Sequence, residues 1–353
     1  MIDWIDFVAP LKHEIGPGTP FYAGEVLAVT PEGNLDWGIF KKMEIEGSHS
    51  TKVQVRSSQM DDGRQGVRIS GNVVKYFQGH NVFGSRNIRA LVLAMLSEVL
   101  VKAGITPGIA DLETWAAGDI DLLRVDDTES NDFGTLPRVL NAIRSLDHTA
   151  NLKFRGRGSF NGHSLLFGKG SRHWSLTLYA KGAELDKHKL PSALLETPLK
   201  AYADGLLRSE VRMLSMHLRK LKLHKLSAWG ENTAIRLHQK HLEQLQIAEA
   251  TMLDSTTLDD IPMRLRLVYQ SWKDGHDLRA MFPRATFYRY RTAMLKCGID
   301  IAIKQEREDQ KESNVVPLRV VLVGKPAHVP EWAMNTPLYF EPDMVDFRTR
   351  EAA

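Results

Sequence analysis

The chain has 353 residues, of which 43% are hydrophobic and 25% charged, and its net charge is +3. This composition is typical of a globular protein of two or three domains, and no run approaches the ~20 apolar residues that a membrane-spanning helix needs. Its single cysteine, Cys297, excludes an internal disulfide and a zinc site of several cysteines. The first residues, MIDWIDFVAP, are acidic where a secretory signal is basic, so we expect a cytoplasmic protein without membrane contact.

Basic residues gather in one stretch of the chain. Residues 151–225 hold 15 Lys and Arg against 5 Asp and Glu, a local charge of +10, so the remainder carries −7. This segment predicts a local polyanion site, although a solvated basic face would have the same composition. The candidate phosphate contacts are Lys153, Arg155, Arg157, Lys169 and Arg172.

The predicted elements begin with residues 1–60, an N-terminal segment of short strand-like runs without an assigned fold. GVRISGNVVKYF (66–77) alternates and predicts a strand pair or a bulged strand. Asn87 is placed to cap a helix over 88–104. Further elements follow in order: a strand over 119–130, a helix over 136–148, strands over 163–167 and 173–181, a helical stretch around 192–206, a strand over 206–214 and a basic helix over 215–226.

This order predicts an α+β domain over 61–226, with an antiparallel sheet backed by helices. Residues 227–302 are expected to form a helical DNA-binding domain, and 303–353 a charged linker followed by a strand over 315–324 and a tail. The segment 263–299 has the layout of a helix-turn-helix, with Thr286, Arg289 and Arg291 exposed early in its second long helix. A generic helical hairpin is the alternative.

Three predicted strands each carry a polar face, because side chains at i, i+2 and i+4 point the same way. The three sets are Arg124, Asp126 and Thr128; Thr177, Tyr179 and Lys181; and Arg208, Glu210 and Arg212. A sheet face packed on helices should be apolar, so we expect this one to be open to water or a ligand.

The combination suggests chemistry on a phosphodiester. Asp126 and Glu210 could hold Mg²⁺ or Mn²⁺ through hard oxygen ligands, and Tyr179 would be the nucleophile. Lys181 could lower the pKa of the phenol or neutralise the phosphate, while Arg124, Arg208 and Arg212 could contact the DNA backbone.

Each pattern also has a plain structural interpretation. A strand tyrosine usually packs, Asp126 beside Asp127 could be a solvated strand end, and Arg-x-Glu-x-Arg could be a surface ion-pair ladder. The sequence has no Walker-type glycine loop, no His-x-His pair and no recognisable Ser-His-Asp arrangement. His238 and His241, one helical turn apart, are expected at the surface.

Six collinear segments resemble the filamentous-phage replication initiators, the gene II endonuclease family. The first contains QGHNVFG, with Gln78, Gly79, His80, Asn81, Phe83 and Gly84. The others are LLRVDDT (122–128), TLYAKGAEL (177–185), GLLRSEVRML (205–214), FPRATFYRYRTAMLKCGI (282–299) and NVVPLRVVLVGKPAHVPEW (314–332). The resemblance covers roughly 65–335, and residues 1–60 match poorly beyond MID.

The resemblance implies an enzyme that nicks the plus strand of a supercoiled origin in the bacterial host and becomes joined to the 5′ phosphate through Tyr179. The free 3′ hydroxyl would prime a host polymerase, with a host helicase and possible self-association on the origin, and the enzyme would later rejoin the displaced strand. Asp126 and Glu210 fall in matching motifs, and Glu184 is a third acidic candidate for the metal.

Two other functions compete with this one. A non-catalytic phage DNA-binding regulator would use the same basic surface without a metal or a tyrosine. A tyrosine recombinase would need a dispersed Arg-His-Arg set and no metal. Metal dependence of strand cleavage separates the three.

Overall fold

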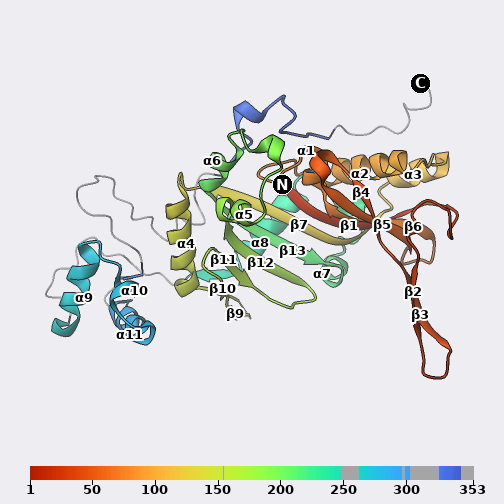
Figure 1. The fold of residues 1–353 in the computed structure, drawn as a ribbon. Coiled ribbons are helices and arrows are strands. Elements are labelled where there is room, and N and C mark those ends of the chain that lie inside the picture. The colour runs from red at the N-terminus through yellow and green to blue at the C-terminus, as the bar shows by residue number, and fades with distance from the viewer. Residues whose placement is uncertain (154, 248–261, 296–298, 303–325, 343–353) are drawn as a thin grey trace.

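A nine-stranded antiparallel sheet forms the centre of the protein in the computed structural model, which describes residues 1–153, 155–247, 262–295, 299–302 and 326–342 (Figure 1). In spatial order its strands are β10 (Ser159–Phe160), β11 (Ser164–Phe167), β12 (Trp174–Ala180), β13 (Leu206–Leu214), β7 (Asp121–Asp132), β1 (Ile2–Pro10), β6 (Gln65–Asn72), β5 (Lys52–Gln59) and β4 (Met43–Glu46).

Helices cover one face of this sheet, the face on which the apolar residues of its strands lie. The helices of this part of the chain are α1 (Val73–Gln78), α2 (Ile88–Lys102), α3 (Ile109–Ala116), α4 (Leu136–Thr149), α5 (Lys181–Lys187), α6 (Leu199–Asp204), α7 (Ser215–Lys220) and α8 (Thr233–Leu242). Helices α2 and α3 contact β1, α4 contacts β12, and α8 contacts β7.

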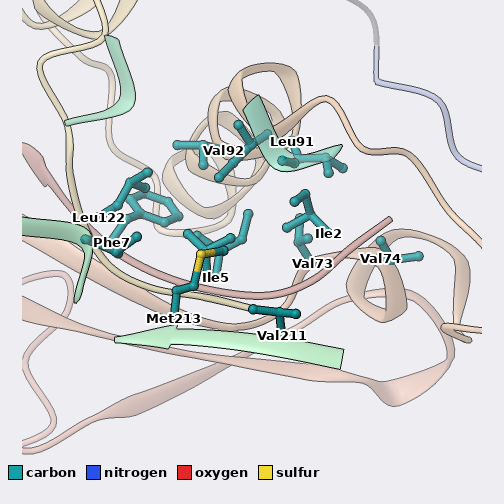
Figure 2. Packing of buried hydrophobic residues seen from close by; sticks show 14 of the residues in the cluster. Ile2, Ile5, Phe7, Val73, Val74, Leu91, Val92, Leu122, Val211 and Met213 are labelled. Atoms are coloured by element: carbon teal, nitrogen blue, oxygen red, sulfur yellow. The ribbon is translucent and has the colours of Figure 1, made fainter. Parts of the chain in front are cut away.

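The core lies between these helices and the sheet. Ile5 and Phe7 of β1 lie near Leu122 of β7 and Leu91 of α2, all almost fully buried (Figure 2). Because strand side chains alternate, burying these residues turns the intervening polar residues to the opposite face. The α+β fold with an antiparallel sheet, expected from the order of elements, is thus confirmed.

Strand β1 lies inside the sheet, paired with both β6 and β7. Strands from residues 1–60 and from 61–226 therefore share one sheet. The interpretation of 66–77 as strand throughout is wrong, because β6 ends at Asn72, whose side chain accepts a hydrogen bond from the Lys75 amide and caps α1. The alternation of buried and polar side chains therefore stops at Asn72, the residue that caps the start of helix α1.

Smaller elements lie around the main sheet. The hairpin of β2 (Glu25–Val29) and β3 (Leu35–Phe40) projects from it, and β14 (Leu245–Ile247), β8 (Ala150–Leu152) and β9 (Gly156–Arg157) form a second sheet (Figure 1). Helices α9 (Met263–Lys273), α10 (Leu278–Met281) and α11 (Arg284–Leu295) share a hydrophobic cluster of their own. The strand predicted over 315–324 lies outside the described residues. Among the residues that the structure describes, no helix is long and apolar enough to cross a membrane.

Candidate active site

The polar faces predicted on three strands come together as one surface. Strand β13 lies between β12 and β7, so that Thr177 stands opposite Glu210, and Glu210 opposite Thr128. On the same face Arg212 is paired with Asp126 in the register of β13 and β7. The alternation in the sequence thus correctly predicted one shared face for these five residues. The expectation that this face is open to water is wrong at its centre, because Asp126 and Thr128 are each 1% exposed.

Three carboxylates interact at the centre of the surface. The side chain of Arg212 bridges two of them, with its Nε 3.1 Å from Asp126 Oδ2 and its Nη2 3.1 Å from Glu210 Oε1. Burial, and next the charges of Asp126 and Asp3, raise the pKa of Glu210 to about 7. Burial also raises the pKa of Asp126, although Arg124 and Arg212 oppose the shift. The cluster therefore holds negative charge that a cation would stabilise.

Asp3 is the member of this cluster that sequence reasoning missed. It lies where the register of β1 against β7 shifts, between Ile2 and Trp4, and its Oδ1 accepts hydrogen bonds from Asn72 and Asn81, both at 2.8 Å. No local pattern marks it. The available signal was the agreement of MID with the gene II family at the start of a segment that otherwise matches poorly.

Tyr179 is buried beside the acids. Its hydroxyl lies 3.5 Å from Glu210 Oε2, and 8% of the residue is exposed. Burial raises the pKa of the phenol well above 10, Arg208 opposes this, and Glu210 and Asp3 add to it. The phenol is therefore neutral at rest and needs a nearby group to take its proton.

Lys181 differs from the expectation of a residue on the face of β12. The strand ends at Ala180, and Lys181 begins α5 as a fully buried side chain. Its Nζ donates to Asn81 Oδ1 at 2.8 Å and lies 2.6 Å from Glu184 Oε2. Burial and the charge of Arg208 lower its pKa to about 8. Glu184, the third acidic candidate, is thus engaged by Lys181.

The QGHNVFG segment forms the loop that supports this site. Gln78 Nε2 donates to the carbonyl of Phe83 at 2.8 Å, which closes the loop on itself. Gly79 has a φ of 81°, and a Cβ there would come within 2.5 Å of the His49 ring. The loop therefore requires glycine at this position for both its conformation and its close packing.

Arg208 and Asn81 join the loop to the strands that carry the polar face. Arg208 was expected to contact DNA, but it is 1% exposed. Its guanidinium donates to the carbonyls of Asn81 and Val82 and, at 2.9 Å, to Ser130 Oγ. The prediction of a phosphate contact is wrong, because all three nitrogens of the buried guanidinium are hydrogen-bonded inside the fold. Asn81 connects Lys181 to Asp3, so the loop fixes the tyrosine strand relative to the acids.

A C-terminal strap, residues 326–341, lies against the loop. His80 Nε2 is 2.8 Å from the carbonyl of Leu338, and the Phe340 amide donates to Gln78 Oε1 at 2.9 Å. The rings of Phe77 and Phe340 stack with centroids 4.1 Å apart. This part of the expected tail is therefore packed against the QGHNVFG loop and helix α1.

Two histidine predictions are wrong. His238 and His241 are 0% and 2% exposed because α8 packs its inner side on the sheet. His238 lies 2.7 Å from Ser209 Oγ and 2.9 Å from Asp127 Oδ2, a Ser-His-Asp arrangement formed by residues far apart in sequence. All three are buried on the helix-covered side, so we interpret the set as an anchor of α8.

Four of the five candidate phosphate contacts in 151–225 are exposed, and Arg155 is not. The Arg155 guanidinium lies 4.4 Å from the centroid of the Trp174 ring and donates to the Trp174 carbonyl, so it is engaged within the fold. The other four candidates are exposed on β9 and in loops: Lys153, Arg157, Lys169 and Arg172.

The helical unit exposes one of the three residues that were expected at its surface. Phe287 and Met294 of α11 are buried, and Arg289 is exposed, with Thr286 half-buried. Arg291, expected to read bases, is 4% exposed, and its Nε lies 2.6 Å from Asp300 Oδ1. This prediction is wrong, because the guanidinium neutralises a buried carboxylate within the unit.

Comparison with known proteins identifies the family. Two family models match, both describing the phage replication-associated protein that is the gene II product: its N-terminal part matches residues 1–232, and its C-terminal part matches 252–339. The chain belongs to the gene II family of replication-associated proteins. It is 32% identical over 339 residues to the replication-associated protein of Enterobacteria phage I2-2, an alignment that covers 94% of this chain and 95% of that protein.

A more distant relative agrees with this assignment. The replication-associated protein of Enterobacteria phage M13 is 28% identical over 326 residues, 75% of this chain and 76% of that protein. The Rolling Circle Replication Initiator Protein from Geobacillus stearothermophilus aligns over 73% of this chain and 88% of its own, with 10% identity and a TM-score of 0.29. The N-terminal family model matches from residue 1, which agrees with the place of β1 in the sheet.

Proposed function

We propose that this chain is a rolling-circle replication initiator that nicks one strand of a phage origin through Tyr179. The relatives are named as replication-associated proteins. The observation that carries the chemistry is the Tyr179 hydroxyl, 3.5 Å from Glu210 in a carboxylate cluster on the polar face of the sheet. Nicking of a supercoiled plasmid that carries the cognate origin, with and without Mg²⁺, tests the proposal.

The proposed step exchanges one phosphodiester for another. Glu210 takes the proton of the Tyr179 hydroxyl, and the phenolic oxygen attacks the scissile phosphorus. The bond from phosphorus to the 3′ oxygen breaks, and that oxygen receives a proton to become the 3′ hydroxyl. The 5′ phosphate remains on Tyr179. The reverse reaction would join the displaced strand, so neither cutting nor closing needs ATP.

The donor set of the acid cluster fits a hard divalent cation such as Mg²⁺ or Mn²⁺. Among the described residues, no group of three or more His, Cys, Asp or Glu side chains stands where it could hold a metal ion. For Asp126 and Glu210 to hold the ion, with Asp3 as a third ligand, Arg212 would have to release the two carboxylates that it bridges and Asp3 would have to approach them. When bound, the ion would stabilise negative charge that develops on the phosphate.

Isosteric changes test the acid cluster. We expect Asp3→Asn, Asp126→Asn and Glu210→Gln each to lower cleavage at least about 100-fold at ordinary Mg²⁺, with partial rescue by Mn²⁺. Glu184→Gln is the control, because its partner is Lys181. Full activity in EDTA would exclude the metal, and loss of Mg²⁺ affinity in Glu184→Gln alone would move the third ligand from Asp3 to Glu184.

The helical unit is proposed to bind duplex origin DNA through α11. We expect Arg289→Ala to lower affinity for the duplex origin by about 1–3 kcal/mol and to leave cleavage of a single-stranded oligonucleotide unchanged. Arg291→Ala should instead destabilise the unit by about 3–5 kcal/mol, because it leaves Asp300 buried without its partner. Thermal unfolding and duplex-binding measurements on the two variants distinguish these effects. If Arg289→Ala lost single-strand cleavage as severely as duplex binding, the helical unit and the sheet would not have separate roles.

The partners follow from the reaction. DNA is the substrate, and a host polymerase would extend the 3′ hydroxyl while a host helicase opens the duplex. The exposed residues Lys153, Arg157, Lys169 and Arg172 remain candidates for phosphate contacts outside the active site. If the protein binds the origin but never cuts it with any divalent ion, the non-catalytic regulator is the better description.

A further inference from the structure

The polar face of the sheet extends past the acid cluster onto the neighbouring strands. Beyond β7 it crosses β1, β6 and β5, where Asp6 stands opposite both Arg124 and Ser70, and Arg68 opposite Arg56. Along β5 and β6 these polar residues alternate with buried valines and isoleucine of the core. The packing that buries the core therefore also fixes this outward row.

Two arginines face each other in this row. Arg56 and Arg68 are directly opposed on antiparallel strands, where like charges are unfavourable. Asp6 takes two hydrogen bonds from Arg68, at 2.8 and 2.6 Å. Burial, and next the charge of Arg68, lower the pKa of Arg56. Within the described residues, the hydrogen bond found for the Arg56 side chain goes to the Phe40 carbonyl at 3.5 Å. An additional anion would stabilise the pair.

Trp4 lies between this pair and the acid cluster. In the register of β1 and β7 it stands opposite Asp126, and the guanidinium of Arg124 lies 4.8 Å from its ring centroid. Its indole Nε1 donates to Ser70 Oγ at 3.3 Å, which fixes the plane of the ring. The ring is half-buried. An oriented aromatic ring beside arginines has the chemistry of sites that stack bases and pair phosphates.

We propose that Trp4, Arg56 and Arg68 form a second contact site for single-stranded DNA, adjacent to the catalytic cluster. The idea rests on the proposed function, since the strand bound here would be the one cut at Tyr179. With neighbouring strands about 4.8 Å apart and about 3.3 Å per residue along a strand, the backbone of the arginine pair lies roughly 16–20 Å from that of Asp126, a distance that a short stretch of single strand covers. The guanidinium groups of Arg56 and Arg68 would bind a phosphate of the strand, and the ring of Trp4 would stack on a base.

Binding without cleavage tests this site. Each variant is made in the Tyr179→Phe protein, and fluorescence anisotropy measures the affinity for labelled oligothymidine of about 15 nucleotides. We expect Arg56→Gln to weaken binding about 5- to 50-fold and to reduce the salt dependence. Trp4→Leu should weaken binding by a similar factor with the salt dependence unchanged. Arg236→Gln, an exposed arginine on α8, is the matched control and should bind normally.

Arg56→Gln guards against misfolding, because the hydrogen bond found for the Arg56 side chain in the described part of the chain is the weak one to the Phe40 carbonyl, whereas Arg68 pairs with Asp6. If folded Arg56→Gln and Trp4→Leu bind oligothymidine as tightly as Arg236→Gln does, the site does not exist. An equal loss of affinity for duplex DNA would also overturn it, since that indicates a general basic surface. Failure of the wild-type chain to nick, with these binding losses intact, would count against the proposed function and not against the site.

Discussion

Tyr179→Phe is expected to abolish nicking of supercoiled origin DNA, by at least about a thousand-fold, while origin binding stays normal. Phenylalanine keeps the buried ring between β11 and β13 and removes only the oxygen that lies 3.5 Å from Glu210. A gel assay of supercoiled plasmid measures nicking, and a mobility shift measures binding.

Tyr202→Phe is the matched control for this experiment. The Tyr202 hydroxyl donates to the carbonyl of His328 at 2.6 Å, so it is engaged by the C-terminal strap. We expect its loss to leave nicking within about threefold of normal, as for one lost hydrogen bond of about 0.5–1.5 kcal/mol outside the site. If Tyr179→Phe nicked normally and Tyr202→Phe were inactive, Tyr202 and not Tyr179 would be the nucleophile.

Removal of the C-terminal strap is expected to lower cleavage of a single-stranded origin oligonucleotide about 100-fold. A chain ending at residue 325 keeps every proposed catalytic residue but loses the contacts of Leu338 and Phe340 with the QGHNVFG loop. That loop carries Asn81, which holds both Lys181 and Asp3. Displacement of about 1 Å in a reacting group can cost this much. Single-turnover cleavage measures the effect.

Point variants separate positioning from general instability. Phe340→Ala removes the ring that stacks on Phe77, whereas Met334→Ala changes an exposed side chain of the same strap. We expect the first to slow cleavage and the second to have no effect. Addition of a peptide of residues 326–342 should partly restore the shortened chain. Full cleavage by the shortened chain would contradict a positioning role.

Much of the catalytic sheet was predictable from alternation. The strands that carry Asp126, Tyr179 and Glu210 lie where the pattern placed them, because each has one buried and one polar face. Alternation cannot give the order of strands, so it could not place β1 inside the sheet. Asp3 was missed for that reason, since its role depends on β1 lying next to β7.

Charged residues were harder to interpret than the strands that carry them. Arg208, Arg291 and Lys181 look like DNA contacts or catalytic groups in sequence, yet each is buried and paired. Their partners are Asn81, Asp300 and Glu184. The partners of Arg208 lie more than 70 residues away, so neither periodicity nor spacing reveals them. A local pattern predicts which face a residue occupies, but tertiary contacts decide whether that face is open.

The most direct test is the site of covalent attachment to DNA. The wild-type protein is incubated with Mg²⁺ and a single-stranded oligonucleotide that spans the origin nick site, denatured, digested and examined by mass spectrometry. We predict one peptide, covering Tyr179, that carries the 5′ phosphate of the cleaved strand. Cleavage with no protein-linked nucleotide, or a nucleotide linked to a residue other than Tyr179, would contradict the proposed reaction.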